Sequence, residues 1–153
     1  MNNKKMAALA IAVFLLLGIT PVYAQIAGTW AGTGEGWCPF PVPYPNEYMK
    51  PWQNWKGSIP NTQNVFSGEW YDGDGNQGTF KSEILFVTEE EAYAGGDWYW
   101  IDNRFDPPVY RWMGPFSMKF KYPPYGRIHC YGEWQGHIPS GIYSGTMKGR
   151  KVD

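Results

Sequence analysis

The sequence predicts an all-β fold, a single antiparallel up-and-down β-barrel of about eight strands, with a β-sandwich as the alternative. Short runs of alternating apolar and polar residues recur along the chain, and clusters of Gly, Pro, Asn and Asp separate them. Almost no stretch favours a helix. Hairpin follows hairpin, which favours the barrel because a closed sheet hides the edges that an open sheet exposes.

Two similar segments predict two related β-meander units. Residues 66–80 read FSGEWYDGDGNQGTF, in which glycines tolerate positive φ and Asp and Asn side chains can bond the turn backbone. Residues 131–145 read YGEWQGHIPSGIYSG and repeat the Gly-Glu-Trp step. A Trp-x-Gly step precedes each copy, at residues 55–57 and 112–114.

The alternation places the strands, and the prolines place a long loop. The predicted strands cover residues 26–33, 55–59, 65–71, 79–87, 97–101, 116–122, 128–134 and 142–148. Residues 37–52 contain five prolines, which exclude both a helix interior and a central strand. The one candidate helix is a single turn after Thr88, where Glu91 would complete a capping box.

Residues 1–24 have the pattern of a signal peptide. Lys4 and Lys5 precede an apolar run that is too short to span a bilayer, and residues 22–24 (Val-Tyr-Ala) provide a cleavage site before Gln25. The sequence therefore predicts a secreted or periplasmic protein whose residues 25–153 form one domain. No later apolar run approaches the roughly 20 residues of a membrane helix, so we expect no membrane-spanning segment.

The charge balance argues against a nucleic-acid partner. The chain carries 13 Lys and Arg against 14 Asp and Glu. Two of the lysines belong to the predicted leader, which leaves 11 basic side chains and a formal charge near −3. Proteins that bind nucleic acid normally present a clustered basic surface.

Cys38 and Cys130 are the only cysteines of the chain. An even pair in an exported protein usually forms a disulfide, so the sequence predicts a bridge between them. The bridge would close a loop of roughly 90 residues, for which chain entropy predicts about 4 to 5 kcal/mol. It would tie the beginning of the domain to its end.

A short motif at the start of the predicted domain resembles a known family. Gly28, Thr29 and Trp30 open the first predicted strand, and a Gly-x-Trp step in this place resembles the opening of the lipocalins and avidins, the calycin-type barrels. The resemblance covers these three residues. It implies a barrel, and it transfers no ligand and no binding residues.

The turn of the first unit has a residue spacing similar to that of a calcium-binding loop. Asp72, Asp74, Asn76, Gly78 and Glu83 stand at offsets 1, 3, 5, 7 and 12, the spacing of oxygen ligands in an EF-hand. The glycine expected at the sixth position is missing, and the flanking segments are predicted strands. A solvated hairpin turn is therefore the favoured interpretation, and a calcium site is the alternative.

The sequence favours a non-catalytic protein without a cofactor. Glu69 and Glu133 occupy matching places, and a glycosidase needs two carboxylates about 5 to 10 Å apart. Both alternate with tryptophans that we expect in the core, so the two carboxylates are predicted to face water. No Gly-x-Ser-x-Gly elbow, Walker phosphate loop or zinc-ligand spacing is present. A glycosidase is the least favoured alternative.

Aromatic residues are the leading candidates for ligand binding. The chain has 9 Trp, 11 Tyr and 8 Phe, and most must fill the core of a small barrel. Rings in loops could stack on a sugar or line the mouth of a pocket. The candidates are Tyr44, Tyr48, Trp52 and Tyr110. The leading hypothesis is an exported barrel that binds a small molecule or saccharide. The alternative is a structural or interaction module, such as an inhibitor or surface component.

Overall fold

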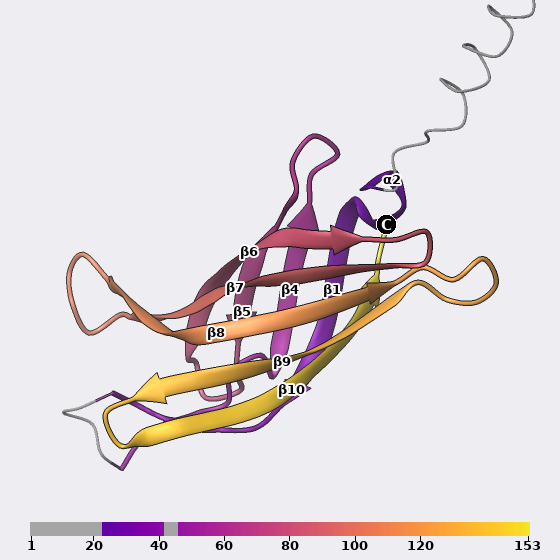
Figure 1. Ribbon diagram of the computed structural model, residues 1–153. Coiled ribbons are helices and arrows are strands. Elements are labelled where there is room, and N and C mark those ends of the chain that lie inside the picture. Colours follow the sequence, from indigo (N-terminus) through magenta and orange to yellow (C-terminus); the bar gives the residue numbers. More distant parts are fainter. Residues whose placement is uncertain (1–22, 42–45) are drawn as a thin grey trace, which may run out of the picture.

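The computed structural model describes residues 23–41 and 46–153 and shows a closed barrel with a small two-stranded ribbon at one end (Figure 1). The elements are α2 (Tyr23–Ile26), β1 (Gly28–Glu35), β2 (Cys38–Pro39), β3 (Tyr48–Met49), β4 (Asn54–Ile59), β5 (Val65–Tyr71), β6 (Gln77–Val87), β7 (Glu91–Asp102), β8 (Val109–Lys121), β9 (His129–Ile138) and β10 (Gly141–Lys151). The β2–β3 ribbon marks one end of the barrel, which we call the ribbon end, and α2 marks the other, the α2 end.

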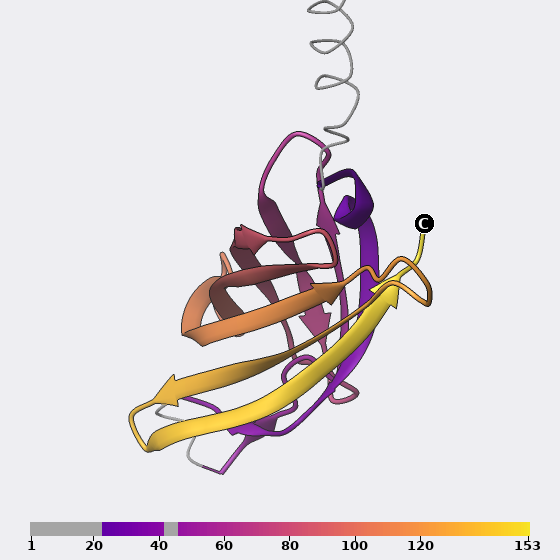
Figure 2. The same ribbon diagram turned by 45° about the vertical axis from the view of Figure 1, so that its right-hand side comes forward.

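The barrel closes through its first strand, which confirms the predicted fold and excludes the sandwich. Strands β4 to β10 pair antiparallel in chain order, and β1 joins β10 to β4. Trp30 of β1 lies opposite Lys151 on one side and Gly57 on the other. Figures 1 and 2 show the β7–β8 and β9–β10 hairpins extending past the body of the barrel at the ribbon end.

Tryptophan rings packed over glycines fill the barrel interior. The fully buried side chains include Trp30, Trp52, Trp70, Trp98 and Trp134. Trp70 lies opposite Gly78, and Trp134 lies opposite Gly145. A Cβ would stand 2.4 Å from the Trp70 indole at Gly78 and 2.5 Å from the Trp134 indole at Gly145. The space that these glycines leave is therefore occupied by the rings.

The sequence repeat holds for one strand of each unit and fails for the strand before it. Trp70 and Trp134 both point into the barrel from equivalent places. Trp55 is buried in β4, whereas Trp112 of β8 is 49% exposed. A β-bulge opposite residues 98–99 adds Met113 to β8 and turns Trp112 outward.

The predicted disulfide is wrong, because Cys38 and Cys130 are both unbonded and buried. Cys38 Sγ packs against Gly136 of β9, where a Cβ would lie 2.6 Å from the sulfur. Gly136 is six residues along β9 from Cys130, which corresponds to roughly 20 Å. A bridge requires Cα atoms within about 7 Å. The two ends of the domain are joined by hydrogen bonds between β1 and β10 instead.

The helical turn predicted after Thr88 is also wrong, because these residues form the β6–β7 turn. The Thr88 N–H donates to the Glu91 carbonyl at 2.7 Å. The Thr88 hydroxyl accepts from the N–H groups of Glu90 and Glu91 at 3.3 and 3.0 Å. These bonds resemble a capping box, but they close a hairpin whose second strand begins at Glu91.

The predicted signal peptide lies almost entirely outside the described residues. Its last residues, Tyr23 and Ala24, belong to the short helix α2. The α2 carbonyl of Ile26 accepts the indole N–H of Trp30 at 2.8 Å, which fixes the start of the barrel. No helix in the described ranges has the length and apolarity needed to cross a membrane.

Replacing Gly78 by Ala should lower the free energy of unfolding by about 2 to 3 kcal/mol. The new methyl would clash with the Tyr99 carbonyl oxygen and with the Trp70 ring. Gly73→Ala is the matched control, because the nearest atom to a Cβ there is 3.7 Å away. Urea unfolding measures both variants, and equal stabilities would contradict the packing described above.

Reducing agent should leave the stability of the folded protein unchanged. Burial raises the pKa of Cys38 and of Cys130 to about 12, so both thiols are poor nucleophiles in the folded state. A thiol-specific reagent should therefore label both cysteines in denaturant and neither cysteine in buffer. A midpoint of unfolding that falls when dithiothreitol is added would contradict the unbonded pair.

Candidate functional site

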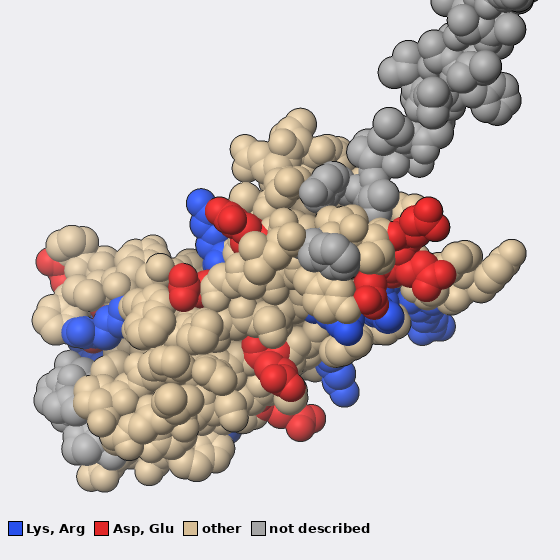
Figure 3. All heavy atoms as spheres, in the orientation of Figure 1, with Lys and Arg blue, Asp and Glu red and all other residues tan. Residues whose placement is uncertain are grey.

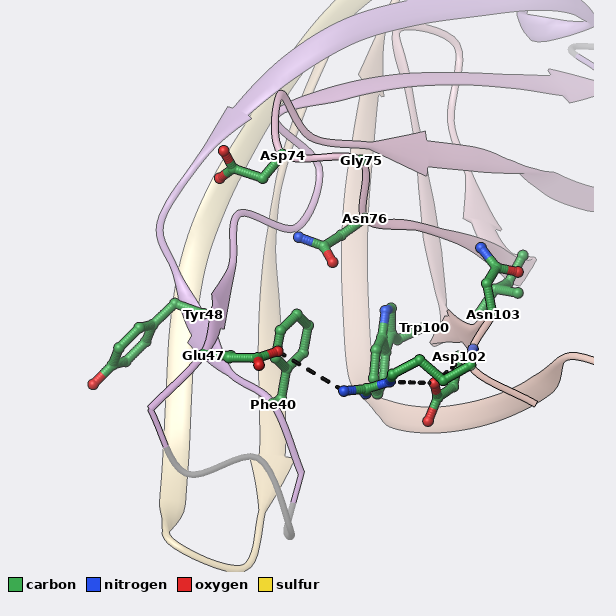
Figure 4. A pocket seen from close by; sticks show the side chains of 11 residues that line it. Phe40, Glu47, Tyr48, Asp74, Gly75, Asn76, Trp100, Asp102 and Asn103 are labelled. Atoms are coloured by element: carbon green, nitrogen blue, oxygen red, sulfur yellow. Dashed lines mark hydrogen bonds and ion pairs between the residues drawn. The ribbon is translucent and has the colours of Figure 1, made fainter.

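An open pocket of about 410 Å³ lies at the ribbon end, where three parts of the chain meet (Figure 4). The β2–β3 ribbon, the β5–β6 turn and the end of β7 with the loop after it supply its walls. The lining residues are Phe40, Glu47, Tyr48, Asp74, Gly75, Asn76, Trp100, Ile101, Asp102, Asn103 and Arg104. We call this hollow the end pocket.

Asp72 fixes the wall that the β5–β6 turn provides. Its carboxylate accepts the N–H groups of Asp74 and Asn76, each at 2.9 Å, and the Asn76 side-chain amide at 2.8 Å. It also accepts the N–H of Lys50 at 3.0 Å, which ties the turn to the segment after β3. Asn76 is thereby held with its side chain pointing into the end pocket (Figure 4).

The floor of the end pocket is a pair of stacked rings. Phe40 and Trp100 stack with centroids 4.7 Å apart and planes 24° apart. The Arg104 guanidinium lies 5.6 Å from the Phe40 centroid and 5.0 Å from the Trp100 centroid. Arg104 Nη1 is also 3.8 Å from a Glu47 carboxylate oxygen. This arginine therefore connects the β2–β3 ribbon to the β7–β8 loop.

Asp102 holds two arginines at the edge of the end pocket. Its fully buried carboxylate accepts Nε of Arg104 at 2.8 Å and Nε of Arg111 at 3.0 Å. Burial acts to raise the pKa of Asp102, but the hydrogen bonds from both arginines outweigh it and hold the pKa below its ordinary value. Asp102 therefore stays ionised at neutral pH and orients the guanidinium groups.

The structure separates those of the predicted ligand-binding aromatics that it describes. Tyr48 belongs to the end pocket and is 52% exposed, but its ring points away from the pocket and packs edge-on against Trp37 (Figure 4). Tyr110 is exposed on β8, outside the end pocket. Tyr44 lies outside the described residues.

The prediction that Trp52 binds a ligand from a loop is corrected by its position. Its ring is fully buried, stacks on Phe80 with centroids 4.4 Å apart, and packs at a tilt against Phe116 with centroids 4.9 Å apart. The backbone reaches this place with a φ of 62°, in the left-handed region that non-glycine residues rarely adopt. Trp52 is thus part of the core.

The residues predicted as alternative calcium ligands have their roles in the β5–β6 hairpin turn. The Asp72 carboxylate is engaged by the turn, and Asp74 lies 3.8 Å from the Lys50 ammonium. Asn76 donates its amide to Asp72 instead of presenting an oxygen beside it. Across residues 23–41 and 46–153, no three His, Cys, Asp or Glu side chains gather as a metal site.

Glu69 and Glu133 cannot act as a glycosidase pair. Both are exposed on the outer face, Glu69 on β5 and Glu133 on β9. Strands β6, β7 and β8 separate them in one direction around the barrel, and β10, β1 and β4 in the other. The two carboxylates therefore stand on opposite walls, whereas a glycosidase places both beside one bond.

Trp100, Asp102 and Arg104 are candidate functional-site residues that were not predicted from the sequence. Asp102 continues the inward-facing series of β7 that contains Trp98 and Trp100, so it is an acidic residue at a core position. An inward carboxylate at a strand end followed closely by Arg104 and Arg111 is a signal that could have been found. That the end of β7 lies close to the β2–β3 ribbon could not have been found from the sequence.

Comparisons with protein-family models, with curated proteins and with solved structures find no match. The interpretation of the end pocket therefore depends on its geometry and chemistry.

Acid should destabilise the native protein more than an Asp102→Asn variant. Because folding lowers the pKa of Asp102, the stability that its ionised form provides is fully present above its ordinary pKa of about 3.9. That stability is lost as the pH falls through the lower folded value. Urea unfolding between pH 6 and pH 2 should give a flatter curve for the variant. Parallel curves of stability against pH for the native protein and the variant would contradict this role of Asp102. Glu69→Gln, which removes an exposed carboxylate, is the control.

Proposed function

We propose that the protein is an exported, non-catalytic barrel that binds a saccharide in the end pocket. The observation that carries the proposal is the convergence of Glu47, Asn76 and Arg104 around an open space beside the Phe40–Trp100 stack. Carboxylate, amide and guanidinium groups are planar and can accept from or donate to neighbouring hydroxyls. Apolar floors with a few convergent polar groups are typical of small-molecule sites.

A hydroxyl-rich ligand suits the end pocket better than an apolar one. The rim holds the charged side chains Glu47, Asp74 and Arg104, which an apolar ligand would bury without replacing their hydrogen bonds. The barrel interior, which in an eight-stranded barrel is wide enough to hold at most one small ligand, is filled by tryptophan here. A volume of about 410 Å³ lies within the usual range of small-ligand sites.

Export is supported by the leader-like segment at residues 1–24. We infer a periplasmic or extracellular location, where a saccharide ligand would be encountered. Two free cysteines are compatible with an oxidising compartment because burial keeps both thiols protonated.

An interaction module is the second candidate, and exposed rings on the other side of the ribbon support it. Trp37 is 53% exposed and contacts Tyr48 and Tyr143, with centroid distances of 5.0 and 5.4 Å. Exposed aromatic clusters often mark protein-binding surfaces. Under this alternative the end pocket would be incidental and a protein partner would cover Trp37.

A titration with neutral mono- and oligosaccharides, followed by tryptophan fluorescence, tests the proposal. Glu47→Gln should weaken binding about tenfold, since a hydrogen bond to a charged group contributes about 1.5 to 3 kcal/mol. Glu69→Gln makes the same chemical change on the outer wall of β5 and should have no effect. A response that is flat across the panel, or equal in both variants, would contradict saccharide binding at the end pocket.

A further inference from the structure

The outer wall of β7 to β10 carries a row of alternating phenol and ammonium groups. Tyr93, Lys119, Tyr131 and Lys148 pair in register on four successive strands and face outward. Neighbouring strands lie about 4.8 Å apart, so the row spans roughly 14 Å. The two lysines are therefore roughly 10 Å apart, as are the two tyrosines.

Lys119 is held in place by rings. Its ammonium lies 4.6 Å from the Tyr93 centroid and 5.7 Å from the Tyr131 centroid. Among the described side chains, neither Lys119 nor Lys148 forms an ion pair, whereas neighbouring Lys121 is paired with Glu91 at 2.5 Å. Cation–π contacts fix an ammonium without neutralising it. The row thus presents fixed positive charge that can still accept an anion.

A shallow groove of about 300 Å³ lies next to this row, across β9, β10 and β1. Its lining residues are Thr33, Gly34, Glu35, Tyr131, Gly132, Glu133, Thr146, Met147 and Lys148. Tyr131 of β9 and Lys148 of β10 are paired directly across the two strands. The next outward-facing residues toward the ribbon end are Glu133 on β9, Thr146 on β10 and Glu35 on β1. The groove therefore has a cationic side and a side of carboxylates and hydroxyls.

We propose that this groove is a second binding site and that it takes an acidic saccharide. The carboxylate of one uronic-acid residue lies against Lys148, and the carboxylate of a second residue of the same chain lies against Lys119. The hydroxyls of the residue at Lys148 donate to Glu133 and exchange hydrogen bonds with Thr146. Tyr131, which is 45% exposed, contacts the sugar ring. The proposal does not depend on the end pocket.

The charge pattern favours this ligand over other polyanions. A phosphate backbone or an anionic membrane presents closely spaced negative charge, which would meet Glu133 and Glu35 beside the lysines. Figure 3 shows basic and acidic side chains close together on the face that it presents, and no continuous basic area. A chain of acidic sugars carries carboxylates and hydroxyls together and so matches both sides of the groove.

The test compares a tetrasaccharide of galacturonic acid with its carboxyl-reduced neutral form by calorimetry at low salt. We expect Lys119→Gln/Lys148→Gln to weaken binding of the acidic form at least tenfold and to leave any binding of the neutral form unchanged. Lys56→Gln/Lys81→Gln removes the same charge from β4 and β6, outside this wall, and should change the affinity less than twofold.

Three results would overturn the inference. The first is no saturable binding of the acidic tetrasaccharide, and the second is an equal loss in both double variants, which would indicate unspecific charge attraction. The third is tighter binding of single-stranded DNA or of vesicles with anionic lipid. Glu47→Gln separates the two proposals, because it should leave acidic binding intact. If Glu47→Gln abolishes that binding and the lysine pair does not, the acid occupies the end pocket and the groove is not a site.

Discussion

Indole rings lying over glycine backbone on neighbouring strands determine the shape of this barrel. An eight-stranded barrel has an interior just wide enough to be filled by side chains. Here the filling is done by a few very large rings, and several of them need a position without Cβ beside the ring, as Trp70 does at Gly78 and Trp134 does at Gly145. The glycines and tryptophans are therefore one feature, and neither can be replaced alone.

Packing takes precedence over local preference in this core. Trp52 keeps a left-handed backbone conformation, which costs a non-glycine residue about 1 to 3 kcal/mol. Its indole N–H, like that of Trp134, is buried without a hydrogen-bond partner among the described groups. The packing of Trp52 against Phe80 and Phe116 offsets these penalties. A filled interior in turn leaves the rim and the outer wall as the places where chemistry can vary.

The sequence predicted the fold well because each strand alternates clearly and each turn contains residues that favour turns. It failed where the outcome depends on distance in space. Cys38 and Cys130 suggested a bridge, but Cys130 lies near the start of β9, whereas Cys38 of β2 packs against Gly136 near the other end of that strand. Of the residues around the end pocket, Tyr48 was named from the sequence but turns its ring away from it, while Asp102 and Arg104 take part only because β7 carries the inward series to the ribbon end.

Indole ¹⁵N–¹H spectra recorded with and without saturating saccharide test the central claim, that ligands bind outside a packed interior. The indole N–H groups of Trp70 and Trp98 donate to the carbonyls of Tyr99 and Gln135 inside the barrel wall. The account predicts that both signals keep their shifts and their slow hydrogen exchange, while the Trp100 signal at the end pocket moves. Shifts at Trp70 and Trp98 with none at Trp100 would show that the ligand enters the barrel, and would contradict the account.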